Sequence, residues 1–201
     1  MNLPNKITLT RIFMIPVFIL IFFLNDVVPF AYGIAAILFA LAACTDFIDG
    51  HIARSRGLVT NLGKFLDPIA DKVLVSTAMI LLLTLKEYFL LITGNAWVYA
   101  IFAISTCVIM ARELIISAFR QIAATRGLVL AAEKLGKYKT TAQDVSIFVI
   151  LFAVGLFVAD SYKAGEVFFW IGLAFFAVAT VLTIWSGISY VVKNKEVLKD
   201  A

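Results

Sequence analysis

The sequence is poor in charged residues, and poorest in acidic ones. Of its 201 residues, 15% are charged and only 13 are Asp or Glu, whereas 63% are hydrophobic. A soluble domain averages about 25% charged and roughly 45–50% apolar residues. The apolar excess falls in blocks long enough to cross a bilayer, which takes about 20 residues per helix. The composition therefore excludes an ordinary soluble protein, and we expect one integral membrane domain over residues 1–201.

Cysteine is nearly absent as well. Cys44 and Cys107 both lie inside apolar runs, so we expect free, buried side chains and no disulfide. The N-terminal apolar stretch lacks the small-residue cleavage site of a signal peptide. We therefore expect this stretch to form the first membrane span.

Six apolar runs predict an all-α fold with six transmembrane helices, at roughly 7–24, 31–54, 65–85, 96–119, 141–159 and 167–192. Backbone groups in lipid must be paired within a segment, and these runs are too long for barrel strands. The second run holds only about 14 apolar residues before Thr45, so it must continue to about Arg54 in order to cross. Asp46 and Asp49 are then predicted inside a membrane helix and not in a loop.

The basic residues are strongly biased to one side of the predicted spans. Two lysines, Lys86 and Lys163, fall in the loops of one side. Twelve basic residues fall on the other side: Lys6, Arg54, Arg56, Lys64, Arg120, Arg126, Lys134, Lys137, Lys139, Lys193, Lys195 and Lys199. Because positive residues mark the cytoplasmic side, we expect a multi-pass protein of the cell membrane with both termini in the cytoplasm.

Four of the few acids, Asp46, Asp49, Asp67 and Asp71, belong to one string, DFIDGHIARSRGLVTNLGKFLDPIAD. A carboxylate at the end of a membrane helix is costly unless it meets a cation or water. Residues three or four apart share a helix face, so an antiparallel turn makes two acidic rows face each other. Four carboxylates can hold two hard cations, Mg²⁺ or Mn²⁺, and paired metals assist phosphoryl-type displacement. The structural alternative is ion pairing with Arg54, Arg56, Lys64 and Lys72.

Small residues accompany the acids. Gly50, Ala53 and Arg54 share the stripe of the second run, and Gly63 lies on that of the third. Gly50 and Ala53 carry almost no side chain, which leaves space for a ligand against the backbone. His51 points away from this stripe, and we interpret it as an interfacial or packing residue.

Basic residues elsewhere are candidates for binding a phosphate group. Arg112 lies deep in the fourth run, where an unpaired guanidinium is costly, and Arg120 follows two turns later on the same face. Lys137 and Lys139 precede the fifth run. Arg binds phosphate as a fork and Lys as a point charge. We expect Arg112, Lys137 and Lys139 to bind the phosphate of a substrate, with Arg120 a weaker candidate. The alternatives are a buried pair of Arg112 with Glu113 or Asp144, and lysines that only anchor the protein to headgroups.

Thr8 and Arg11 lie one helical turn apart at the start of the first run. They are candidates for contact with a lipid phosphate. The alternative for Arg11 is a side chain that extends along the helix to the headgroups.

The aspartate string resembles the signature of the CDP-alcohol phosphotransferase family. The sequence matches this signature at every fixed position from Asp46 to Asp71. The signature reads Asp-x-x-Asp-Gly-x-x-Ala-Arg, then eight residues, Gly, three residues, Asp, three residues and Asp. The segments NLPNKITLTR, ARELIISAFR and GKYKTTAQ are similar to bacterial members that use a glycerol phosphate acceptor. The resemblance implies a six-helix, usually homodimeric fold with a cavity on the cytoplasmic side. It also implies that the four aspartates bind two metal ions and that Asp71 is the general base.

The resemblance further implies the substrates. The donor would be CDP-diacylglycerol, bound near Gly50, Ala53, Arg54 and Gly63, and the acceptor sn-glycerol 3-phosphate, whose hydroxyl attacks the lipid-bearing phosphorus as CMP leaves. No nucleic-acid partner is expected. Two alternatives stay open: the same chemistry with inositol phosphate, serine or phosphatidylglycerol, and a divalent-cation channel or transporter. A channel predicts carboxylates along the whole membrane depth, whereas here they cluster at one side.

Overall fold

The computed structural model describes residues 3–28, 30–55, 61–125 and 134–194. For residues 3–6, 46–55, 61–68, 124–125 and 134 it gives the backbone alone. All regular structure in these ranges is helical, which confirms the all-α prediction. The seven helices described are α1 (Leu3–Phe23), α2 (Ala31–Ser55), α3 (Asn61–Thr84), α4 (Lys86–Thr93), α5 (Ala96–Thr125), α6 (Lys134–Val158) and α7 (Tyr162–Lys193).

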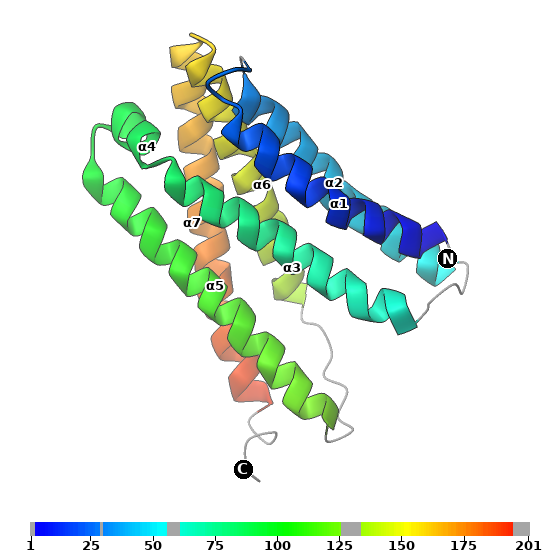
Figure 1. Cartoon of the computed structure of the whole chain (residues 1–201). Coiled ribbons are helices and arrows are strands. Elements are labelled where there is room, and N and C mark those ends of the chain that lie inside the picture. The colour runs from blue at the N-terminus through cyan, green and yellow to red at the C-terminus, as the bar shows by residue number, and fades with distance from the viewer. Residues whose placement is uncertain (1–2, 29, 56–60, 126–133, 195–201) are drawn as a thin grey trace.

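The helices pack into a bundle built on pairs of sequence neighbours. The most extensive contacts join α6 to α7, α1 to α2 and α2 to α6. Figure 1 shows α1 and α2 side by side, with α4 at the opposite end of the molecule from the N-terminal end of α1. The N-terminal halves of α3 and α6 and the C-terminal half of α5 therefore lie away from α4, and these are the halves that carry the polar residues.

Several helices are long and apolar enough to cross a membrane. In the described part of the chain these are Ala96–Ala123, Leu135–Val158 and Tyr162–Lys193, with Ile69–Thr84 and Lys86–Thr93 a fourth if the bent pair counts as one span. The apolar parts of α1 and α2 are shorter, at Ile7–Phe23 and Ala31–Thr45. The protein is thus a helical multi-pass membrane protein. By helix length and composition, three or four spans are identified in the described residues.

Helix α4 was not predicted, because the segment after the third apolar run is expected to be a loop. It begins directly after Leu85 and is bent by 61° from α3. Gly94 ends it in the left-handed conformation, with φ 64°, and its N–H donates to the carbonyl of Leu90. Glycine adopts this conformation without steric cost. At eight residues the helix is too short to span a bilayer, so its sequence pattern is not distinctive.

Two helix boundaries bear on the polar half of the molecule. Helix α2 continues through Asp46 and Asp49 to Ser55, which confirms the prediction from its short apolar run. Helix α6 begins at Lys134, so the expectation that Lys137 and Lys139 precede this helix is wrong. Hydropathy marks only the apolar part of a helix, and Lys is a good helix former, so the helix can begin before the apolar run.

The cysteine prediction is half right. Cys44 and Cys107 are both free, but both are exposed on the surface of their helices and not buried. An apolar run cannot reveal which face of a membrane helix meets lipid, because both faces are apolar.

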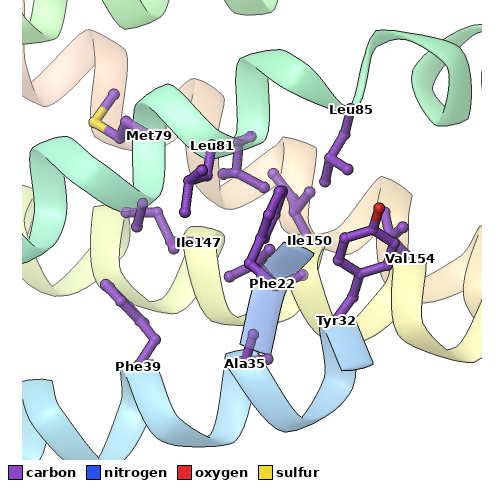
Figure 2. Packing of buried hydrophobic residues seen from close by; sticks show 14 of the residues in the cluster. Phe22, Tyr32, Ala35, Phe39, Met79, Leu81, Leu85, Ile147, Ile150 and Val154 are labelled. Carbon is purple, nitrogen blue, oxygen red and sulfur yellow. The ribbon is translucent and has the colours of Figure 1, made fainter. Parts of the chain in front are cut away.

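The core lies where α1, α2, α3 and α6 meet. Figure 2 shows its aromatic and aliphatic side chains interleaved between these helices. Phe22 and Tyr32 contact each other edge to face with ring centroids 5.0 Å apart. Met79 of α3 and Ile147 of α6 both belong to this cluster. The core therefore fixes α3 against α6 one turn beyond the polar residues described below.

Helices α2 and α6 approach closely at Gly33 and Gly155. A Cβ added to Gly155 would lie 2.5 Å from the backbone N of Gly33 and 2.9 Å from its Cα. Both atoms belong to backbone, so the helices would have to separate to admit a methyl group.

Replacing Gly155 with Ala is therefore expected to destabilise the bundle. Overpacking costs about 1–3 kcal/mol, which corresponds to a melting temperature lower by roughly 3–10 °C in a protein of this size. Thermal unfolding of the purified protein in detergent measures the change. Gly136→Ala in the same helix is the control, because among the described residues no atom outside the adjacent helix backbone lies within 4 Å of the added Cβ. Equal melting temperatures for the two variants would contradict the close approach.

Candidate active site

A pocket lies between α3, α5 and α6 in the polar half of the molecule. Its cavity volume is about 100 Å³, and it is partly open to the surroundings. Its walls are apolar side chains such as Val75, Ile109 and Leu114. Into this apolar frame project seven polar residues: Asp71, Lys72, Ser76, Glu113, Lys139, Thr140 and Gln143.

Asp71 lines the pocket from α3. It shares the pocket wall with Val75 and Met79, four and eight residues later on the same helix face. This face, which carries the last aspartate of the string, is thus turned toward α5 and α6. Asp67 lies four residues earlier, on the same face of the helical backbone.

The other predicted metal ligands can be placed only by their backbone. Asp46 and Asp49 lie in α2, Asp67 lies in α3, and the two helices are in contact. Among the side chains that the structure describes, no three His, Cys, Asp or Glu residues gather. The structure does not describe the side chains of these three aspartates or of Ala53 and Arg54, and it gives only the backbone of Gly50 and Gly63. The binuclear metal site therefore stays a prediction.

Glu113 joins two of the predicted phosphate ligands. Its Oε1 accepts a hydrogen bond of 2.9 Å from Nη1 of Arg112, and the same oxygen accepts one from Nζ of Lys139. The Lys139 side chain is only 4% exposed. Two cations share one carboxylate, so the cluster of Arg112, Glu113 and Lys139 carries a net positive charge, although Asp71 adds a negative charge to the same pocket. Such a cluster attracts an anion, and a buried cation here is less costly because it is paired.

Arg112 itself reaches away from the pocket, toward α7. Its Nη2 donates to Oγ of Ser186 at 3.1 Å, and its stem passes Gly187, where an added Cβ would lie 3.1 Å from the Cγ of Arg112. Its Nε is buried and has no hydrogen-bond partner among the described residues. Arg112 thus meets the pocket through Glu113, and the predicted alternative of a pair with Glu113 is present in the structure.

Lys137 and Arg120 lie elsewhere. Lys137 is exposed and is not part of the pocket wall. Arg120 donates from Nε to the hydroxyl of Tyr190 at 3.2 Å, and its guanidinium lies 5.4 Å from the centre of that ring. This cation–π contact joins the ends of α5 and α7. Of the four predicted phosphate ligands, only Lys139 lines the pocket. Arg112 is linked to it through Glu113, and Lys137 and Arg120 lie outside the pocket wall.

Thr8 and Arg11 are both buried, each 1% exposed. The Nε of Arg11 donates to Oγ1 of Thr45 at 3.3 Å, in the turn of α2 directly before Asp46. A buried guanidinium cannot extend to the headgroups at the surface, so that alternative for Arg11 is wrong. Its charge lies beside the helix that carries the first two aspartates.

Five polar residues of the pocket were not predicted as site residues: Lys72, Ser76, Glu113, Thr140 and Gln143. Lys72 and Glu113 enter the sequence analysis only as possible structural ion-pair partners. Lys72 donates from Nζ to Oγ of Ser117, which ties α3 to α5. The available signal was spacing: Gln143 lies four residues after Lys139, on the same helix face. The spacing indicates a shared helix face only if both residues are helical, and the apolar run alone does not predict a helix that includes Lys139.

Comparison with known proteins gives matches over nearly the whole chain. A family model described as CDP-alcohol phosphatidyltransferase matches residues 1–185. The chain is 38% identical over 210 residues to a CDP-diacylglycerol–glycerol-3-phosphate 3-phosphatidyltransferase of Bacillus subtilis (strain 168), covering 100% of this chain and 98% of the relative. It is 38% identical over 202 residues to the Escherichia coli (strain K12) protein of the same name, covering 99% and 98%.

Proposed function

Because this chain belongs to the CDP-alcohol phosphatidyltransferase family, we propose that it makes phosphatidylglycerol phosphate and CMP from CDP-diacylglycerol and sn-glycerol 3-phosphate. The observation that carries this function is the 38% identity along the full length of relatives that bear this one activity in their name. The pocket supports it independently, because a candidate base and a buried cation line the same wall. The reaction belongs to phospholipid synthesis.

The reaction is a displacement at phosphorus. The acceptor hydroxyl oxygen forms a bond to the lipid-bearing phosphorus, while the bond from that phosphorus to the CMP oxygen breaks. The hydroxyl proton passes to the carboxylate of Asp71, and CMP leaves with the bonding electron pair. Asp71 is proposed as the base because its side chain lines the pocket in which a small acceptor fits.

The donor set of the aspartate string fits two hard divalent cations. Carboxylate oxygens are the ligands that Mg²⁺ and Mn²⁺ prefer, and unbroken helical backbone puts Asp46 with Asp49, and Asp67 with Asp71, on shared faces. We propose that these four residues hold two Mg²⁺ or Mn²⁺ ions. When bound, such ions supply positive charge that neutralises a pyrophosphate and its leaving group.

The acceptor phosphate is proposed to bind at Lys139. Lys139 lines the pocket and is almost fully buried. Glu113 accepts hydrogen bonds from both Lys139 and Arg112. A phosphate that binds beside Lys139 would meet the net positive charge of the cluster of Arg112, Glu113 and Lys139. Arg112 supports this site from the α7 side, while direct contacts by Lys137 and Arg120 remain predictions without support from the pocket geometry.

The remaining features follow from the family and the charge pattern. We propose that Gly50, Ala53, Arg54 and Gly63 line the binding site of the CDP-lipid, with Thr8 and Arg11 near its phosphate. Six spans, both termini in the cytoplasm, location in the cytoplasmic membrane and a homodimer complete the proposal. The positive-inside distribution of Lys and Arg supports the orientation.

A headgroup assay tests the function directly. Purified protein in detergent, given CDP-diacylglycerol and Mg²⁺, is expected to release CMP with sn-glycerol 3-phosphate at a kcat/KM roughly 100-fold above that with serine, inositol phosphate or phosphatidylglycerol. Equal CMP release with another alcohol would overturn the acceptor and keep the reaction class. Cation flux through vesicles without CMP release would favour the channel alternative, which the family match argues against.

A further inference from the structure

Gln143 is a buried amide in the wall of the pocket. Its side chain lies on α6, one helical turn after Lys139, and the residue is 3% exposed. Residues four apart on a helix face are separated by about 6 Å between Cβ atoms. The amide and the ammonium group therefore present two different polar functions to one small volume.

The hydrogen bonding of Gln143 is far below its capacity. An amide side chain offers two N–H donors and a carbonyl acceptor. In the described part of the chain, its one hydrogen bond joins Nε2 to the sulfur of Met79 at 2.9 Å. A thioether is a weak acceptor, and buried polar groups normally have strong partners. The side chain of Met79 is packed in the hydrophobic core, so Gln143 cannot gain a stronger hydrogen-bond partner at this position unless the core repacks.

The three polar functions of the acceptor match this wall. On the proposed function, the phosphate lies at Lys139 and the attacking primary hydroxyl at Asp71. The secondary hydroxyl of the acceptor is then the group left to bind. A hydroxyl both donates and accepts, and an amide offers both partners.

We propose that Gln143 determines acceptor specificity by hydrogen-bonding the secondary hydroxyl of the glycerol phosphate. This inference rests on the proposed function and deepens it, because it assigns a residue to the choice among alcohol phosphates. A site with a buried amide rejects an analogue that lacks the hydroxyl, since the amide then stays without a strong partner.

The test compares two acceptors that differ by this one hydroxyl. sn-Glycerol 3-phosphate and 3-hydroxypropyl phosphate share the phosphate and the primary hydroxyl, and only the first carries the secondary one. The parent enzyme is expected to prefer glycerol phosphate roughly 10- to 100-fold in kcat/KM for CMP release. In Gln143→Met, which keeps the volume and removes the amide, the preference should fall to about threefold or less. The rate with glycerol phosphate should fall because its hydroxyl loses a partner, while the deoxy acceptor should lose nothing or gain, because no amide is left without a partner.

Control variants separate this role from a structural one. Gln143→Asn keeps the amide but withdraws it by one methylene, so an intermediate preference is expected. Thr140→Val changes a neighbouring polar side chain whose hydroxyl already donates to the carbonyl of Gly136 at 3.0 Å, and the preference should persist.

Three outcomes would overturn the proposal. The parent enzyme could use both acceptors equally, or Gln143→Met could lower both rates by the same factor and leave the preference unchanged. Both results remove the role of Gln143 and keep the proposed function, because CMP is still released with glycerol phosphate. A parent enzyme that releases no CMP with glycerol phosphate removes the proposed function itself.

Discussion

Asp71→Asn is expected to lower kcat for CMP release by roughly 1,000-fold or more, with the KM for glycerol phosphate changed by less than about threefold. An amide cannot accept the proton of the attacking hydroxyl, and general-base catalysis contributes about 10²- to 10⁴-fold. The effect should fall mainly on the chemical step, because Asp71 takes the hydroxyl proton while the acceptor is proposed to be held by its phosphate at Lys139. Initial rates at saturating donor and varied acceptor measure both constants.

Asp160→Asn is the matched control for this variant. Asp160 is exposed in the turn between α6 and α7, with φ 61°, a conformation that Asn tolerates equally well. It lies 17 residues after Gln143, or roughly 25 Å along the helix axis. The control should keep parental activity. An Asp71→Asn protein that turned over at the parental rate would refute the role of this carboxylate.

Lys139→Met is expected to raise the KM for glycerol phosphate roughly 10- to 100-fold, because a charge-assisted hydrogen bond to phosphate is worth about 1.5–3 kcal/mol. Glu113 forms ion pairs with Arg112 and Lys139 among the described residues, and the variant keeps only the pair with Arg112. The carboxylate would therefore repel an incoming phosphate more strongly. The KM for CDP-diacylglycerol should stay within about threefold of the parent value. Acceptor and donor titrations of the same preparation give both constants.

Lys137→Met provides a control of the same charge two residues away. Lys137 is exposed outside the pocket wall, so its removal should change the acceptor KM by less than about threefold. Lys139→Arg should restore part of the affinity, because it keeps the charge. Breaking a buried ion pair is destabilising, so melting temperatures of all three variants accompany the kinetics. Equal increases in both KM values for Lys139→Met would point to a structural role alone.

The helices were predictable where length and hydropathy leave one solution. The short apolar run before Asp46 forced α2 to continue through the acids, and it does so to Ser55. Helix α4 and the first turns of α6 were missed for the opposite reason. Their residues are polar or the segment is short, and a hydropathy pattern does not separate a polar helix end from a loop.

The site was predictable to the extent that its residues are close in sequence. Asp71 and Lys139 were predicted as site residues from the sequence alone, and both line the pocket. The roles of Glu113 and Gln143 depend on which helix faces meet across more than 25 residues of sequence, and no spacing rule reports that. Arg112 shows the same limit, since its turn toward Ser186 depends on room made by Gly187 on a helix far along the chain.

The pocket draws its wall from α3, α5 and α6, and this has a consequence for biosynthesis. A nascent chain that has inserted only as far as α3 already contains all four aspartates but neither Lys139 nor Gln143, the groups proposed to bind the phosphate and the secondary hydroxyl of the acceptor. The acceptor site is assembled only when α6 docks on α3 and α5, late in membrane insertion.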